Sequence, residues 1–195
     1  MASIELKRRL ILTGPPGIGK TTIVKTVSKF LSDHNVPVLG FYTEEVRKKG
    51  QRIGFDVVSL DGGRARLARS EDSGEQIPAT SHRVGKYSVL IREFEAVVLP
   101  IFEKIAVSPG SPVVVIDEIG KMELFSDHFV GNIKQLLKLK NLIILSTIPV
   151  AKGKPIPLVE AVRNDKTSSL FTIDTTNRAQ MPSTLLEIII NLHNL

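Results

Sequence analysis

Cysteine is absent from this chain of 195 residues, and aromatic residues make up only 5% of it. The absence of cysteine excludes disulfide bonds, cysteine-ligated zinc and a thiol nucleophile. Proteins that bind single-stranded nucleic acid stack the bases on aromatic side chains, so the scarcity of aromatic residues argues against such binding. The net charge of +6 therefore does not indicate a nucleic-acid partner. We expect basic clusters such as Lys7–Arg9 and Arg47–Lys49 to be solvated surface.

Long hydrophobic runs are also missing. No apolar run approaches the roughly 20 residues that a membrane helix needs, and Leu10–Leu12 is too short for the apolar region of a signal peptide. A chain without cysteine also suits a reducing compartment. We therefore expect a soluble, intracellular protein of the cytoplasm that has no membrane partner, is a monomer and forms one domain over 1–195.

Short apolar runs alternate with helical patterns along most of the chain. This alternation predicts a three-layer α/β fold with a mainly parallel sheet. Between about 45 and 87 the pattern changes to short strands separated by glycine turns, which indicates an antiparallel hairpin insertion at the sheet edge, and 72–83 is expected to be a mobile surface loop. We expect strands at 9–13, 36–44, 112–117, 142–147 and 170–174, and helices at 20–33, 127–139, 158–163 and 182–193. A further helix from about Val89 is expected to kink or break at Pro100.

A glycine-rich loop lies between the first predicted strand and the first predicted helix. Residues 14–21 read GPPGIGKT and match G-x-x-x-x-G-K-[ST], the loop whose backbone N–H groups surround phosphates at a helix N-terminus. In such a loop Lys20 reaches the β- and γ-phosphates as a catalytic cation, and the Thr21 hydroxyl binds Mg²⁺. The predicted nucleotide-binding residues of the loop are Gly14, Pro15, Pro16, Gly17, Ile18, Gly19, Lys20, Thr21 and Thr22.

Two carboxylates follow the apolar run at 112–116. Asp117 and Glu118 would lie at the carboxyl edge of a parallel sheet, where ligands of α/β folds bind. We assign both to the nucleotide site: Asp117 as a ligand of Mg²⁺ through water, and Glu118 as the catalytic group that polarises an attacking water. The alternative for Glu118 is a solvated residue at a strand end.

Further polar residues at strand ends allow two interpretations each. Ser146 and Thr147 either contact the γ-phosphate or its attacking water, or simply end a strand before Pro149. Glu44 and Glu45 either lie near the metal or form a charged strand end.

Four blocks of the sequence carry a resemblance to a known family. They are TGPPGIGKTT, 40–58 with GFYTEEVR, 115–125 with DEIGKMEL, and 146–164 with STIPVAKG, and together they resemble the cancer-related nucleoside-triphosphatase family. The resemblance implies a P-loop NTPase fold and slow, Mg²⁺-dependent hydrolysis of ATP, GTP, CTP and UTP to the diphosphate and phosphate. The chain departs from the family at Ser146, where glycine is expected, and at Thr176, where glutamate is expected before Asn-Arg.

The spacing of lysines and arginines in the sequence does not show which cation stabilises the transition state, and an unknown activating protein could supply it.

Two alternative functions remain open. A nucleotide or small-molecule kinase would need an acceptor pocket and a lid, for which 61–83 with its arginines is the candidate. A regulatory switch would read the bound nucleotide through a partner. The cations considered are Arg47, Arg52, Arg83, Lys121, Arg163 and Arg178, and the arginines of the lid candidate are Arg64, Arg66, Arg69 and Arg83.

Overall fold

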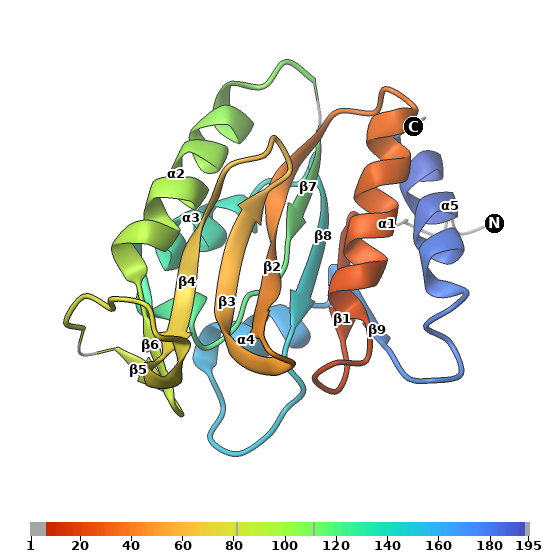
Figure 1. Cartoon of the computed structure of the whole chain (residues 1–195). Helices are drawn as coiled ribbons and strands as arrows, with labels where there is room; N and C mark the ends of the chain where they lie inside the picture. The colour runs from red at the N-terminus through yellow and green to blue at the C-terminus, as the bar shows by residue number, and fades with distance from the viewer. Residues whose placement is uncertain (1–6, 81, 111, 194–195) are drawn as a thin grey trace.

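One sheet runs through the part of the chain that the computed structural model describes, residues 7–80, 82–110 and 112–193. Nine strands of the described residues form it (Figure 1). Across the sheet they are β5 (Arg83–Val84), β6 (Tyr87–Val89), β4 (Arg64–Ser70), β3 (Gln51–Ser59), β2 (Val38–Lys48), β7 (Val113–Ile116), β8 (Ile143–Ile148), β1 (Arg9–Thr13) and β9 (Ser168–Thr172).

Helices cover both faces of this sheet, which confirms the three layers expected from the sequence. The helices α1 (Lys20–Asp33) and α5 (Met181–His193) lie on one face, and α2 (Ile91–Val107), α3 (Asp127–Leu136) and α4 (Pro157–Arg163) lie on the other (Figure 1). Successive strand residues point to opposite faces. In β1, Leu10 and Leu12 therefore join the core under α1, while Ile11 joins the core under α2.

The sheet has a parallel part and an antiparallel part. From β2 through β7, β8 and β1 to β9 all pairings are parallel, and from β2 outward to β5 all are antiparallel. The expected insertion at the sheet edge is thus present, and we call β3 to β6 the antiparallel extension. The sequence does not predict its two shortest strands, β5 and β6, and the 3₁₀ turn Glu71–Ser73 overlaps the start of the predicted surface loop.

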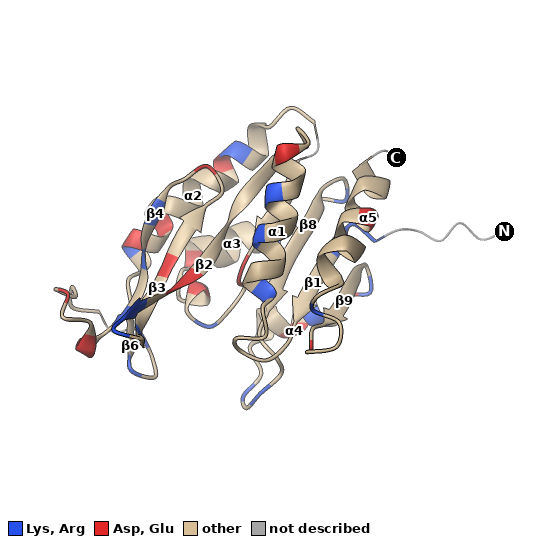
Figure 2. Ribbon diagram, turned by 45° about the vertical axis from the view of Figure 1, so that its right-hand side comes forward, with Lys and Arg blue, Asp and Glu red and all other residues tan. Residues whose placement is uncertain are grey.

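The hypothesis that 61–83 forms a lid is wrong for residues 64–70, which form strand β4. Strand β4 pairs with β3 on one side and β6 on the other, so it is fixed in the sheet. Arg69 is only 4% exposed and donates to Asp56 at 2.6 Å and to the Phe55 carbonyl at 2.9 Å. The other arginines of the segment are also paired: Arg64 with Glu44 and Asp56, Arg66 with Glu75 and Glu93, and Arg83 with Glu71. Charges of both signs therefore intermingle along the extension (Figure 2).

Helix α2 continues through Pro100, so the expectation of a break there is wrong. Proline removes one helical hydrogen bond and crowds the preceding turn. On both sides of it, however, Val98, Ile101, Phe102 and Ile105 are buried against the sheet. Burial of these side chains offsets the local cost, because packing of an apolar face contributes more to a helix than propensity does.

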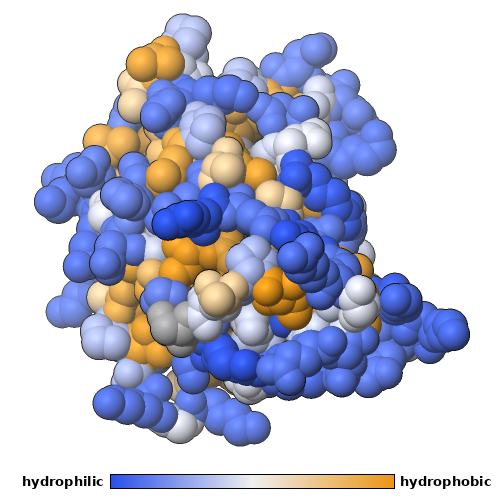
Figure 3. Space-filling view, turned by 60° about the vertical axis from the view of Figure 1, so that its left-hand side comes forward, coloured by the Kyte–Doolittle hydropathy of each residue, from blue (hydrophilic) through white to orange (hydrophobic). Residues whose placement is uncertain are grey.

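Among the described residues no helix combines the length and the apolar character needed to cross a membrane. On the face that carries α2 and the antiparallel extension, hydrophilic side chains interrupt the hydrophobic ones (Figure 3).

Gly40 marks a close approach between β2 and β7. It pairs with Val115 at φ +145, and a Cβ atom there would lie 2.0 Å from the Val115 carbonyl oxygen. Only glycine fits, because both the backbone conformation and the neighbouring strand exclude a side chain.

Gly40→Ala is therefore expected to lower the free energy of unfolding by about 3 kcal/mol, through backbone strain and overlap with β7. Urea unfolding followed by circular dichroism measures this. The matched control is Gly131→Ala in α3, where a Cβ atom would meet nothing within 4 Å and the higher helix propensity of alanine should stabilise slightly. Equal stability of the two variants would contradict the role given to Gly40.

Candidate active site

The phosphate loop connects β1 to α1 at the carboxyl edge of the parallel strands. Gly19 is the N-cap of α1, and no side chain caps this helix end. The first N–H groups of a helix have no partner within the helix, so the loop presents donors and a positive helix end to an anion. Lys20 is 9% exposed, and its Nζ donates to the Gly14 carbonyl at 2.9 Å and to the Pro15 carbonyl at 3.4 Å.

The loop opens into a cavity of about 540 Å³ that extends along the sheet edge. Of the residues assigned to the site, all except Pro15, Ile18 and the buried Asp117 line it. The lining residues from the parallel part and the loops are Gly14, Pro16, Gly17, Gly19, Lys20, Thr21, Thr22, Lys25, Glu118, Lys121, Met122, Glu123, Pro149 and Val150. Those from β2 and the antiparallel extension are Thr43, Glu44, Glu45, Arg52, Phe55, Leu67 and Val84.

Asp117 lies at the end of β7 and is held from two sides. The Thr21 hydroxyl donates to Oδ2 at 2.7 Å, and the Thr147 hydroxyl donates to Oδ1 at 2.6 Å. Burial raises the pKa of Asp117, while these hydroxyls and the charge of Lys20 oppose that shift. The two predicted metal ligands, Thr21 and Asp117, are therefore in direct contact, and the hydrogen bond from Thr147 orients the Asp117 carboxyl.

Ser146, the neighbour of Thr147, has a different environment. Its hydroxyl is buried and has no hydrogen-bond partner among the described residues. The side chain points to the opposite face of β8 from Thr147, since successive strand residues alternate. This favours the interpretation of Ser146 as a strand residue over a role at the phosphate.

Two carboxyl groups meet beside Gly120 in the loop after β7. A Cβ atom on Gly120 would lie 2.5 Å from Oε1 of Glu118 and 2.9 Å from Oε2 of Glu123. Burial raises the pKa of Glu118, which the charge of Lys20 lowers and that of Asp117 raises. Burial and the neighbouring charge of Glu118 raise the pKa of Glu123 to about 8. Glu123 belongs to the block DEIGKMEL, but its spacing from Asp117 and Glu118 gives no local signal that it joins the site.

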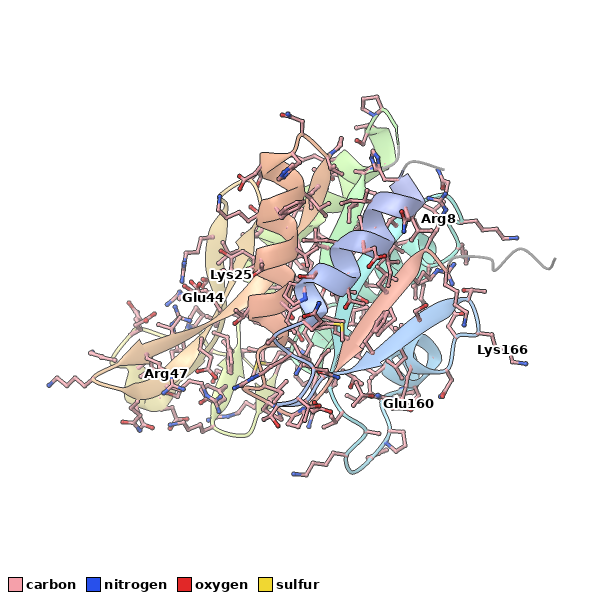
Figure 4. All side chains as sticks on the ribbon, turned by 90° about the vertical axis from the view of Figure 1, so that its right-hand side faces the viewer. Arg8, Lys25, Glu44, Arg47, Glu160 and Lys166 are labelled. Carbon is pink, nitrogen blue, oxygen red and sulfur yellow. The ribbon has the colours of Figure 1, made fainter. Side chains whose placement is uncertain are left out.

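Glu44 and Glu45 line the cavity and are both paired with cations. Lys25 of α1 and Glu44 of β2 point toward one another, with 2.9 Å between Nζ and Oε1 (Figure 4), and this bond is the main cause that lowers the pKa of Glu44. Glu45 accepts from Arg47 at 2.7 Å and from Arg52 at 2.9 Å. Their charges are thus neutralised by neighbours, which favours a charged strand end over metal binding.

Of the six cations considered for the transition state, Arg52 and Lys121 line the cavity. Arg52 is held by Glu45 and by the Tyr87 hydroxyl at 2.9 Å. Arg163 instead donates to the Pro149 carbonyl and to Thr13. The others, Arg47, Arg83 and Arg178, are not among the lining residues.

Comparison with known proteins assigns this chain to a family. A family model described as NTPase matches residues 9–186. The human cancer-related nucleoside-triphosphatase is 49% identical over 177 residues, 89% of this chain and 92% of the human protein. The chain belongs to the NTPase family. The resemblance seen in the four sequence blocks is thereby confirmed.

Two solved structures of NTPase family members have the same fold. The crystal structure of THEP1 from the hyperthermophile Aquifex aeolicus matches with a TM-score of 0.79 and 31% identity, covering 92% of this chain and 98% of that one. The solution structure of a human cancer-related nucleoside triphosphatase matches with a TM-score of 0.78 and 46% identity, covering 94% and 98%. These matches confirm the P-loop NTPase fold class.

The buried carboxyl of Glu123 predicts a pH dependence of stability. Its pKa of about 8 in the folded protein exceeds the ordinary value of 4.5, so the folded state holds this proton more tightly than the unfolded chain does. Between these two pH values the folded state binds more protons, and the free energy of unfolding falls as pH rises through the window. Glu123→Gln keeps the uncharged shape and is expected to flatten this fall.

Urea unfolding between about pH 5 and about pH 8, in the presence of a chelator, measures the slope. Asp117 and Glu118 also have raised pKa values, so the fall should shrink without vanishing. Glu103→Gln on the exposed side of α2 is the control and should keep the wild-type slope. A wild-type slope in Glu123→Gln would contradict the assignment.

Proposed function

We propose that this protein hydrolyses nucleoside triphosphates to the diphosphate and phosphate, slowly, with Mg²⁺ and with broad base specificity. The observation that carries the proposal is the 2.7 Å hydrogen bond between Thr21 and Asp117, next to Lys20 of the phosphate loop and to Glu118 in the same cavity. Binding groups for phosphate and metal, and a base for water, thus adjoin one another.

The donor set at Thr21 and Asp117 fits Mg²⁺, which prefers hydroxyl, carboxylate, water and phosphate oxygens. Thr21 would bind the ion directly, and Asp117 would hold it through water. When bound, Mg²⁺ would neutralise charge on the β- and γ-phosphates. Lys20 would exchange its bonds to the loop carbonyls of Gly14 and Pro15 for phosphate oxygens.

Glu118 would act on the attacking water. The water oxygen bonds to the γ-phosphorus, the bond from that phosphorus to the β–γ bridging oxygen breaks, and the proton passes to Glu118. The raised pKa of Glu118 supports this role, because a general base works best when its pKa approaches the working pH.

The slow rate would follow because the cavity arginine is already engaged by other side chains. Arg52 is bonded to Glu45 and Tyr87, and a guanidinium held in this way is less available to the transition state. An arginine from an activating protein would raise the rate by about 10³- to 10⁵-fold. The broad base specificity is supported by the loop itself, which binds phosphates through backbone groups that every nucleotide shares.

Phosphate release from ATP, GTP, CTP and UTP, with Mg²⁺ and no acceptor, tests the proposal. Lys20→Ala and Glu118→Gln are each expected to reduce release by at least about 100-fold, and a chelator should abolish it. The matched controls are Lys29→Ala, an exposed residue of α1, and Glu103→Gln. The mechanism fails if Glu118→Gln releases phosphate at the wild-type rate.

Gly120→Ala is expected to lower kcat by at least about tenfold, since its Cβ atom would overlap the Glu118 carboxyl and displace it from the water. Nucleotide affinity, measured by calorimetry with a non-hydrolysable analogue, should stay within about twofold because the phosphate loop is intact. Gly131→Ala serves as control. Unchanged kcat in Gly120→Ala would show that Glu118 does not depend on this contact.

A further inference from the structure

The cavity continues beyond the residues that hydrolysis needs. Past Glu118 it extends over the antiparallel extension to a group of six lining residues that we call the distal chamber. Four of them are apolar, and the other two are paired with each other at 2.9 Å. The six residues are Glu45, Arg52, Phe55, Leu67, Val84 and Met122.

The distal chamber lies on the side from which a nucleophile must approach. The strand order β1, β8, β7, β2, β3, β4 puts Glu118, after β7, between the phosphate loop and the distal chamber. In phosphoryl transfer the attacking and leaving oxygens are roughly in line. With the leaving group held by the loop, as in the proposed function on which this inference rests, the attacking oxygen comes from the Glu118 side.

Water alone does not account for an apolar wall at that place. A water molecule occupies about 30 Å³ of liquid and needs two to four polar partners, whereas Phe55, Leu67, Val84 and Met122 offer carbon surface. Sites for small organic ligands have the composition seen here, an apolar lining with a few placed polar groups. The lining therefore fits the body of an organic molecule that presents a hydroxyl to the γ-phosphate.

The charges around the chamber favour an uncharged molecule. Three carboxyl groups face this part of the cavity, from Glu45, Glu118 and Glu123, against the cations Arg52 and Lys121. Arg52 is already paired with Glu45, so its charge is not free for an additional phosphate or carboxylate, and Glu118 beside it would repel one. Hydroxyl groups, by contrast, can donate to carboxylate oxygens, as the hydroxyls of a sugar do.

Arg52 provides a platform for a ring. Its guanidinium carbon lies 5.2 Å from the centre of the Phe55 ring and 5.7 Å from that of Tyr87, and its Nε donates to the Tyr87 hydroxyl. A guanidinium plane fixed in this way stacks well on a planar base. The guanidinium would thus stack on a base, while the carboxylates would accept hydrogen bonds from the hydroxyls of a ribose.

We propose that the distal chamber is an acceptor subsite for a neutral, ring-bearing alcohol of nucleoside size, to which the γ-phosphoryl group is transferred. The acceptor oxygen bonds to the γ-phosphorus, the bond from phosphorus to the β–γ bridging oxygen breaks, and the hydroxyl proton passes to Glu118. The products are the nucleoside diphosphate and a phosphate monoester. Hydrolysis is the outcome when water occupies the place of the alcohol.

The experiment uses the full chain, Mg²⁺ and GTP labelled at the γ-phosphate, with adenosine, guanosine, cytidine or uridine present at millimolar concentration. The ratio of labelled nucleoside monophosphate to labelled inorganic phosphate is measured. At least one nucleoside is expected to receive label in at least about tenfold excess over water, because a bound hydroxyl has a high effective concentration.

Val84→Phe would fill the chamber and is expected to lower this ratio by about tenfold for that nucleoside. The matched control is Val107→Phe at the end of α2, where the side chain is 81% exposed; the ratio should not change. Thermal unfolding of both variants checks that they fold.

The two proposals fail separately. Phosphate release without any nucleoside monophosphate overturns the acceptor subsite and leaves hydrolysis intact. Transfer to a nucleoside without release to water overturns the hydrolysis proposal and supports the subsite. A nucleoside that raises the KM for GTP without receiving phosphate overturns the subsite, because the chamber then holds the base of the triphosphate itself.

Discussion

The burial of the Asp117 carboxylate is the constraint on which the rest of the site depends. A carboxylate that is 1% exposed is costly unless hydrogen bonds replace its water. Thr21 and Thr147 provide these bonds from the first turn of α1 and from β8. These two hydrogen bonds form only if β1, β8 and β7 are neighbours in this order. The order of the parallel strands therefore also determines the geometry around the phosphate loop.

A second buried charge organises the antiparallel extension. Arg69 and Asp56 are 4% and 8% exposed and contact each other across β3 and β4, and Arg69 also donates to two backbone carbonyls. Because a buried arginine without these partners would be severely destabilising, the pair specifies one register of the two strands. That register fixes Arg52 and Phe55 on the cavity wall, so an ion pair outside the cavity determines which side chains face it.

Much of this fold could be predicted because its signals are local. The loop from Gly14 to Thr21 and the buried strands β7 and β8 stand out in any window of the sequence, and their boundaries agree within about two residues. Strand β6 and the contact of Thr147 with Asp117 depend on residues far away in the chain, and no local pattern encodes them. Pro100 shows the reverse case, since a strong local signal for a break yields to packing of the same helix on the sheet.

Several carboxyl groups lie close together in and beside the cavity, although burying their charges lowers the stability of the fold. Asp117, Glu118 and Glu123 all have raised pKa values, which means that burial opposes their charged forms. Glu44 and Glu45, by contrast, sit on the same cavity wall with lowered pKa values because arginine and lysine neutralise them. The chain thus pairs the carboxylates at the rim individually, whereas Asp117 and Glu118 at the centre share the charge of Lys20. In the proposed function, a cation that arrives with the nucleotide would relieve this imbalance, so the same crowding that costs folding free energy would favour binding of the metal and its triphosphate.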